Sequence, residues 1–152
     1  MSRVEQEPRV DREMGVAFER ATELLDAGLS QARRELPDPP FRIMESSNRS
    51  GWERSAPPFY LWQFWIFKDE EWEGRIRRAG VQLHYFEPVV NGISRELKVR
   101  IVAEIFRRGA LSDVERVDER RIALAELSGP EAVAAVIRDA IAEADAELSG
   151  LR

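Results

Sequence analysis

Glu96 and Lys98 are the residues of this sequence whose types and spacing could act together on a phosphate. One residue separates them in the segment 93–106, which is rich in β-branched side chains, so on a strand both would lie on one face. The carboxylate could help to hold Mg²⁺, and the ammonium could stabilise the charge that develops on a phosphate during cleavage. Glu87 is the acidic residue nearest to the predicted hairpin and would supply a second ligand. These three residues are the catalytic candidates if the protein is an enzyme.

The tripeptide Glu96-Leu97-Lys98 resembles the metal-binding strand of restriction-type nucleases. The resemblance implies a magnesium-dependent nuclease, with Mg²⁺ as the cofactor. This sequence departs from that pattern, because Glu87 precedes a proline and is not part of a Pro-Asp pair. Alternating Glu and Lys is also common on the solvated face of a hairpin, where opposite charges pair across strands. We therefore keep the nuclease as the alternative function and assign no catalytic residue or metal site.

Composition excludes several other classes of function. The chain has no cysteine, which removes disulfides, thiolate metal sites and cysteine nucleophiles, and His84 is its single histidine. A Ser-His-Asp triad would need His84, yet no serine lies in a Gly-x-Ser-x-Gly turn, and neither common glycine-rich phosphate-binding motif is present. The net charge of −5 opposes nucleic-acid binding, which depends on neutralising phosphates. Without a long apolar run or an apolar stretch in residues 1–12, the sequence predicts a cytoplasmic protein that does not enter membranes.

Residues 59–67 form an aromatic run that is apolar on both faces of the strand it predicts. A half-solvated strand would alternate apolar with polar residues, so this strand must be covered on both sides, by helices or by a partner. Aromatic side chains dominate protein interfaces because they bring large contact areas at a low entropic cost. We therefore expect a non-catalytic domain that binds a protein or forms a homodimer, of the adaptor, chaperone-like or immunity type. Its candidate binding residues are Trp52, Tyr60, Trp62, Phe64 and Trp72.

The elements that must position these residues follow from periodicity and capping signals. Apolar residues at helical spacing predict amphipathic helices over about 12–36 and from Pro130 to the end, with Pro37 stopping the first. Strands are predicted at 41–45 and 59–67, separated by a surface loop over 46–58. Charges arranged to suit a helix dipole predict a short helix over 69–79. Asn91-Gly92 predicts a hairpin between 81–90 and 93–106.

Two segments admit more than one prediction. Residues 93–108 could form a helix capped by Ser94, although their β-branched content favours a strand. Residues 112–121 could be helix or loop, and 122–127 a last strand. The predicted fold class is α+β: a mostly antiparallel sheet of four to five strands, long N- and C-terminal amphipathic helices and one short internal helix. We expect a flexible N-terminus over residues 1–10 and a single domain over 11–152. The helices could cover opposite faces of the sheet or the same face.

Overall fold

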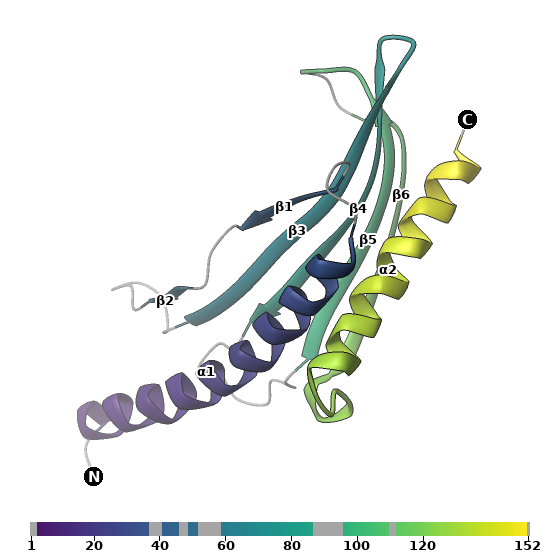
Figure 1. Ribbon diagram of the computed structural model, residues 1–152. Coiled ribbons are helices and arrows are strands. Elements are labelled where there is room, and N and C mark those ends of the chain that lie inside the picture. The colour runs from purple at the N-terminus through teal and green to yellow at the C-terminus, as the bar shows by residue number, and fades with distance from the viewer. Residues whose placement is uncertain are drawn as a thin grey trace.

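The computed structural model describes residues 3–36, 41–45, 49–51, 59–86, 96–109 and 112–151. These residues form an α+β fold in which two helices pack against an antiparallel sheet (Figure 1). The helices lie at the two ends of the sequence, as predicted. In this part of the chain, neither helix is long and apolar enough to cross a membrane.

The sheet follows the order β1-β3-β4-β5-β6, and the short strand β2 also pairs with β3. From β3 onward each strand pairs with the next one in the sequence, so the four long strands form an antiparallel meander. The strand bounds are β1 Phe41–Glu45, β2 Arg49–Gly51, β3 Phe59–Trp72, β4 Arg75–Phe86, β5 Glu96–Phe106 and β6 Ser112–Ala123.

The prediction of a short internal helix over 69–79 is wrong. That segment contains the end of β3, the start of β4 and a two-residue turn at Glu73 and Gly74, both with positive φ. Positive φ at both central residues gives the type of turn whose twist matches that of antiparallel strands. The charges that suited a helix dipole instead pair across the hairpin, since Arg78 Nε lies 2.6 Å from Asp69 Oδ1. The pairing of β3 with β4 has overridden the helix-capping signals.

Other predictions have mixed outcomes. Residues 96–106 are a strand, as favoured, and Ser112–Ala123 is also a strand rather than helix or loop. The segment 122–127, predicted as a possible last strand, contains the end of β6 and then a 3₁₀ turn over Leu124–Glu126. β2 lies within the segment predicted as a loop, and the Asn91-Gly92 turn lies outside the described residues.

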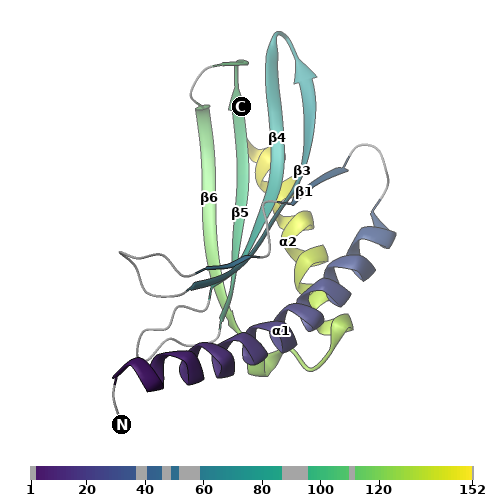
Figure 2. The same cartoon turned by 90° about the vertical axis from the view of Figure 1, so that its left-hand side faces the viewer.

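Helix α1, Arg3–Glu35, and helix α2, Pro130–Gly150, lie on the same face of the sheet. In Figure 2 the strands β4, β5 and β6 lie in front of α2. The possibility that the helices cover opposite faces is therefore wrong. The start of α1 at Arg3 places it within the segment predicted to be a flexible terminus, and the flexibility of residues 1–10 stays a prediction.

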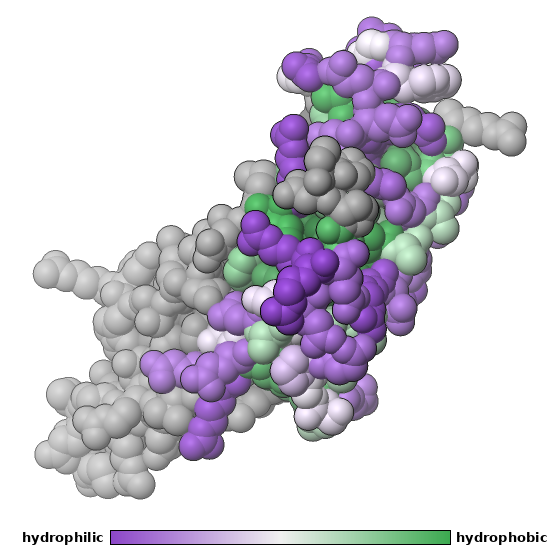
Figure 3. All heavy atoms as spheres, in the orientation of Figure 1, coloured by the Kyte–Doolittle hydropathy of each residue, from purple (hydrophilic) through white to green (hydrophobic). Residues whose placement is uncertain are grey.

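One hydrophobic core lies between the helices and this face of the sheet. It contains alternate residues over much of β3, β4 and β5 together with one stripe of each helix, which is the pattern that the strand and helix periods require. Hydrophilic residues cover most of the coloured surface in Figure 3, and hydrophobic residues show mainly as a band near its middle. The largest fully buried side chains are Trp62, Tyr85, Leu25, Ile66, Leu83, Leu97, Ile101, Ile105, Ile137, Val81, Val99 and Val133.

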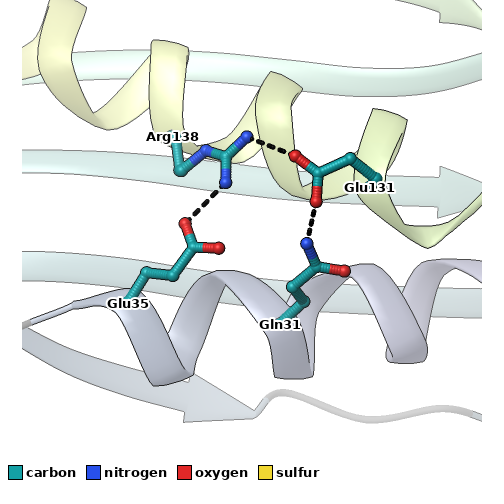
Figure 4. A network of polar contacts seen from close by, with 4 residues as sticks. All are labelled: Gln31, Glu35, Glu131 and Arg138. Carbon is teal, nitrogen blue, oxygen red and sulfur yellow. Dashed lines mark hydrogen bonds and ion pairs between the residues drawn. The ribbon is translucent and has the colours of Figure 1, made fainter.

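The two helices approach closely because a glycine lies at their contact. An added Cβ on Gly28 would lie 2.3 Å from Val133 Cβ and 3.1 Å from the carbonyl oxygen of Pro130. Polar side chains also join the helices outside the core (Figure 4): Arg138 donates to Glu35 at 2.6 Å and to Glu131 at 2.8 Å. The same Glu131 accepts a hydrogen bond from Gln31. Such exposed ion pairs contribute little energy individually, so apolar packing holds the helices together and these contacts help to set their alignment.

Candidate functional site

Trp62 and Phe64, two of the predicted binding residues, lie in the core beneath the helices. Trp62 is completely buried, and its Nε1–H donates a hydrogen bond of 2.8 Å to Asp26 on α1. The ring centroid of Phe64 lies 4.7 Å from that of Trp62. The prediction that these two rings form a binding surface is therefore wrong for the folded domain, because α1 and α2 cover this face of β3.

The other three predicted binding residues do not join a common patch with them. Trp72 is 48% exposed at the end of β3, where Arg77 lies over its ring at 5.8 Å from the centroid. The same Arg77 donates to the carbonyl oxygen of Leu148 at 3.0 Å, so it ties the tip of the hairpin to the end of α2. Trp52 lies outside the described residues, and Tyr60 belongs to β3 by its backbone alone.

The residues of the alternative nuclease site are only partly placed. Glu96 and Lys98 lie in β5 and, being two residues apart, point to the face away from the helices. Lys98 Nζ lies 3.8 Å from the carboxylate of Glu119 on β6, which is cross-strand pairing. Glu87 lies outside the described residues. Within the described ranges, no group of three or more metal-ligating side chains comes together.

The face of the sheet opposite the helices carries a second apolar cluster. Phe67, Ile76 and Val102 are each at least 91% buried, yet none belongs to the core beneath the helices. The strand register places all three on the opposite face. Among the described elements no helix covers this cluster, and its neighbour Val117 on β6 is 42% exposed. We call the outward-facing residues of β3 to β6 the open face.

Trp65 gives the open face its central feature. Its ring stacks on Phe67 with centroids 5.7 Å apart and planes 22° apart. The far end of the same ring lies over Gly80 of β4, where an added Cβ would lie only 2.6 Å from Cη2 of Trp65. Gly80 has no side chain, and the indole occupies that space against the backbone. The aromatic run is thus apolar on both sides because one side faces the core and the other builds the open face.

Arg78 fixes the rings at one end of this cluster. Its guanidinium lies 4.8 Å from the centroid of Phe67 and 4.9 Å from that of Phe106, so it sits between two aromatic rings. Asp69 holds it with hydrogen bonds of 2.6 and 2.8 Å, and Glu104 lies 3.6 Å away. The hydrogen bond that Arg78 donates to Asp69 raises the pKa of Arg78, and partial burial opposes this increase. The arginine therefore stays charged and holds the phenylalanine rings in one arrangement.

We expect Gly80→Ala to lower the free energy of unfolding by about 1–3 kcal/mol, because the new methyl group must displace the Trp65 ring. Urea denaturation measures the loss, and the near-ultraviolet circular dichroism of the indole should change. In a Trp65→Leu background the same substitution should cost much less, since the clash is absent. Equal costs in both backgrounds would contradict the close packing of indole on backbone.

His84 lies on the open face between Gln63 of β3 and Lys98 of β5. Partial burial lowers its pKa and the charge of Lys98 lowers it further, against a smaller opposing effect of Glu119. The unfolded chain therefore binds a proton more readily than the folded chain does. Stability must fall as the pH drops through the unfolded pKa of about 6.5, until the folded histidine is also protonated.

We expect His84→Gln to remove that part of the pH dependence. The urea midpoints of wild type and variant should differ by an amount that changes between about pH 7 and pH 5, the range below the pKa of a free histidine. Lys98→Gln is the matched partner, because it should weaken the effect without abolishing it. A difference between wild type and His84→Gln that stays constant over this range would contradict the lowered pKa.

Sequence reasoning missed most of the open face. Trp65 and Phe67 were visible as the second apolar side of the aromatic strand. The contribution of Ile76 was hidden because residues 69–79 were assigned to a helix. Val102 lies between the apolar residues Ile101 and Ala103, and Val117 stands among charged neighbours, so neither gave an apolar stripe of its own. The signal that could have found the face is a glycine opposite a tryptophan, but this needs the strand register.

No protein-family model, curated protein or solved structure matches this chain. The open face is a broad sheet surface with a partly exposed aromatic cluster and paired charges around it. Such a face is suited to contact with another protein surface.

Proposed function

We propose that this protein is a non-catalytic binding domain that contacts a protein partner through the open face of its sheet. The observation that carries the proposal is the second apolar cluster, which lies outside the helix-covered core and has exposed Val117 beside it. A strand with one face against the core and the other in solvent alternates apolar residues with polar ones. Here Phe67 and Val102 occupy positions that a solvated face would give to polar residues.

The composition of the face supports the same function. Interfaces are enriched in aromatic residues and arginine, with charges arranged around an apolar centre. Trp65 and Phe106 are partly exposed, and Arg78 lies beside the rings of Phe67 and Phe106. By contrast, Lys98 of the alternative nuclease hypothesis is engaged in cross-strand pairing with Glu119.

Photo-crosslinking tests this function in the native host. Benzoylphenylalanine placed at Val117 should form an adduct with a protein, because this position is exposed beside the cluster. The matched control is the same residue at Asp139, which is exposed on α2 behind the sheet. An adduct at position 117 and none at 139 supports binding through the open face. No adduct at 117, or equal adducts at both positions, would show that the open face is not the binding surface.

A further inference from the structure

We infer that the partner of the open face is a second copy of this chain, packed face to face with a two-fold axis that runs across the strands. This inference rests on the proposed function, since it uses the same surface. Two properties of the open face support the inference: the arrangement of its charges and its size.

The charges on the open face are sorted by row. A row here is the set of outward-facing residues that the register aligns across β3, β4, β5 and β6. One row is rich in carboxylates, and a row at the other end of the apolar centre carries cations and no carboxylate. The acidic row is Asp69, Arg78, Glu104 and Glu115, and the basic row is Gln63, His84, Lys98 and Arg121.

Two rows lie between these and form the centre of the face. One contains Phe67, Gly80, Val102 and Val117, and the next contains Trp65, Gln82, Arg100 and Glu119. Phe67, Val102 and the Trp65 ring therefore lie between the acidic row and the basic row, and Ile76 lies in the next row beyond the acidic one. Charge separated in this way along the strands makes the face complementary to an inverted copy of itself.

A two-fold axis across the strands, placed between the two central rows, performs this inversion. It lays each strand over the same strand of the second copy in the opposite direction. Glu104 then faces the partner's Lys98, and Glu115 faces the partner's Arg121, while Phe67 faces the partner's Trp65. An axis parallel to the strands would place each row over itself. The acidic row would then meet a second row of net negative charge, although Arg78 would still face the partner's Glu104. The first arrangement instead brings the net negative row over the positive row.

The face is also large enough for a stable dimer. Its four strands have 14, 12, 11 and 12 residues. At about 4.8 Å between strands and about 3.3 Å per residue they span roughly 700 Å². A standard interface buries about 800 Å² on each partner. The packing of two such faces would form a sandwich of two sheets, with one pair of helices on each outer side.

Site-directed cross-linking tests the arrangement, because the natural chain has no cysteine. Glu115→Cys and Arg121→Cys place thiols at two exposed positions of β6. The reagent is a short bismaleimide whose reach matches the ~10 Å spacing of packed sheets. Each variant is tested alone, and the two are tested after co-expression with different tags. Asp139→Cys, on the other side of the molecule, is the control.

We expect efficient cross-linking in the co-expressed pair and at least fivefold less in either variant alone. Equivalent positions in the two chains would lie roughly 20 Å apart along the strands, beyond the reach of the linker. Analytical ultracentrifugation of the wild type should show a dimer, and Glu115→Lys should weaken it at least fivefold. Co-expression of Glu115→Lys with Arg121→Glu should restore association, because opposite charges again meet.

Other results would overturn the inference in distinguishable ways. Cross-linking of each variant by itself, with no gain in the mixture, would indicate an axis parallel to the strands, and the open face would remain the binding surface. A dimer that cross-links in neither arrangement would place the self-interface elsewhere. A wild type that sediments as a monomer, with an adduct of a different protein at position 117, would replace self-association by a foreign partner. A monomer without any adduct would overturn the proposed function as well.

Discussion

Replacing Gly28 with alanine is expected to lower the free energy of unfolding by about 1–3 kcal/mol. In an ordinary helix this substitution would stabilise the protein by up to about 1 kcal/mol, because glycine is a poor helix former. The new Cβ would lie 2.3 Å from Cβ and Cγ1 of Val133, both of which are close to the backbone of α2. The helices would have to move apart, since neither atom belongs to a flexible side-chain end.

Urea denaturation at fixed protein concentration measures this effect. Val133→Gly supplies the matched background, because it removes both Cβ and Cγ1, the two atoms that the new Cβ would strike. Gly28→Ala should cost less, or even stabilise, in that background, and the difference is the coupling between the two sites. If alanine at position 28 raises the stability of the wild-type chain, the two helices do not approach as closely as described.

Trp62→Ala is expected to be the most destabilising of the tryptophan substitutions, at about 3–5 kcal/mol. The side chain is fully buried, so its removal leaves a cavity beneath α1, and Asp26 also loses its hydrogen-bond donor. Trp72→Ala is the control, because that ring is 48% exposed and its loss should cost less than about 1 kcal/mol. Far-ultraviolet circular dichroism in urea measures both without relying on tryptophan fluorescence.

The substitutions Trp62→Ala and Trp72→Ala also distinguish a core residue from a binding residue. If Trp62 served a partner, its replacement would leave the isolated domain stable and would reduce association. We expect the opposite result, a large loss of stability. A Trp62→Ala variant as stable as the wild type would contradict the burial of β3 beneath α1 and α2.

The sequence predicts well those elements whose signals are local and periodic. The C-terminal helix begins at Pro130 and the first strand spans 41–45, as expected from capping and alternation. The prediction over 69–79 was wrong because dipole-like charges and cross-strand pairs can have the same order in a sequence. Asp69 and Arg78 show this, since only the hairpin register brings them together. A local sequence pattern does not reveal which residues of two strands will pair.

The open face was predictable only in part for the same physical reason. Its rows are made of residues from four strands, and each strand contributes one residue to each row. The acidic and basic rows therefore do not exist as runs in the sequence, where Glu, Lys and Arg alternate and look like ordinary solvated surface. The sequence shows that Trp65 is apolar. It does not show that the ring lies over Gly80, because this contact depends on the pairing of β3 with β4.

The packing of α1 on α2 has a consequence for synthesis on the ribosome. β3 to β6 pair in the order in which they emerge, so most strand contacts can form early and at low cost in loop closure. Leu25 and Leu29 belong to a core that is completed by α2, the second helix, which has 21 residues. Until that helix has left the exit tunnel, the nascent chain must keep one face of its sheet and one stripe of α1 unshielded. We expect truncation before Pro130 to yield a chain that requires a chaperone to stay unaggregated.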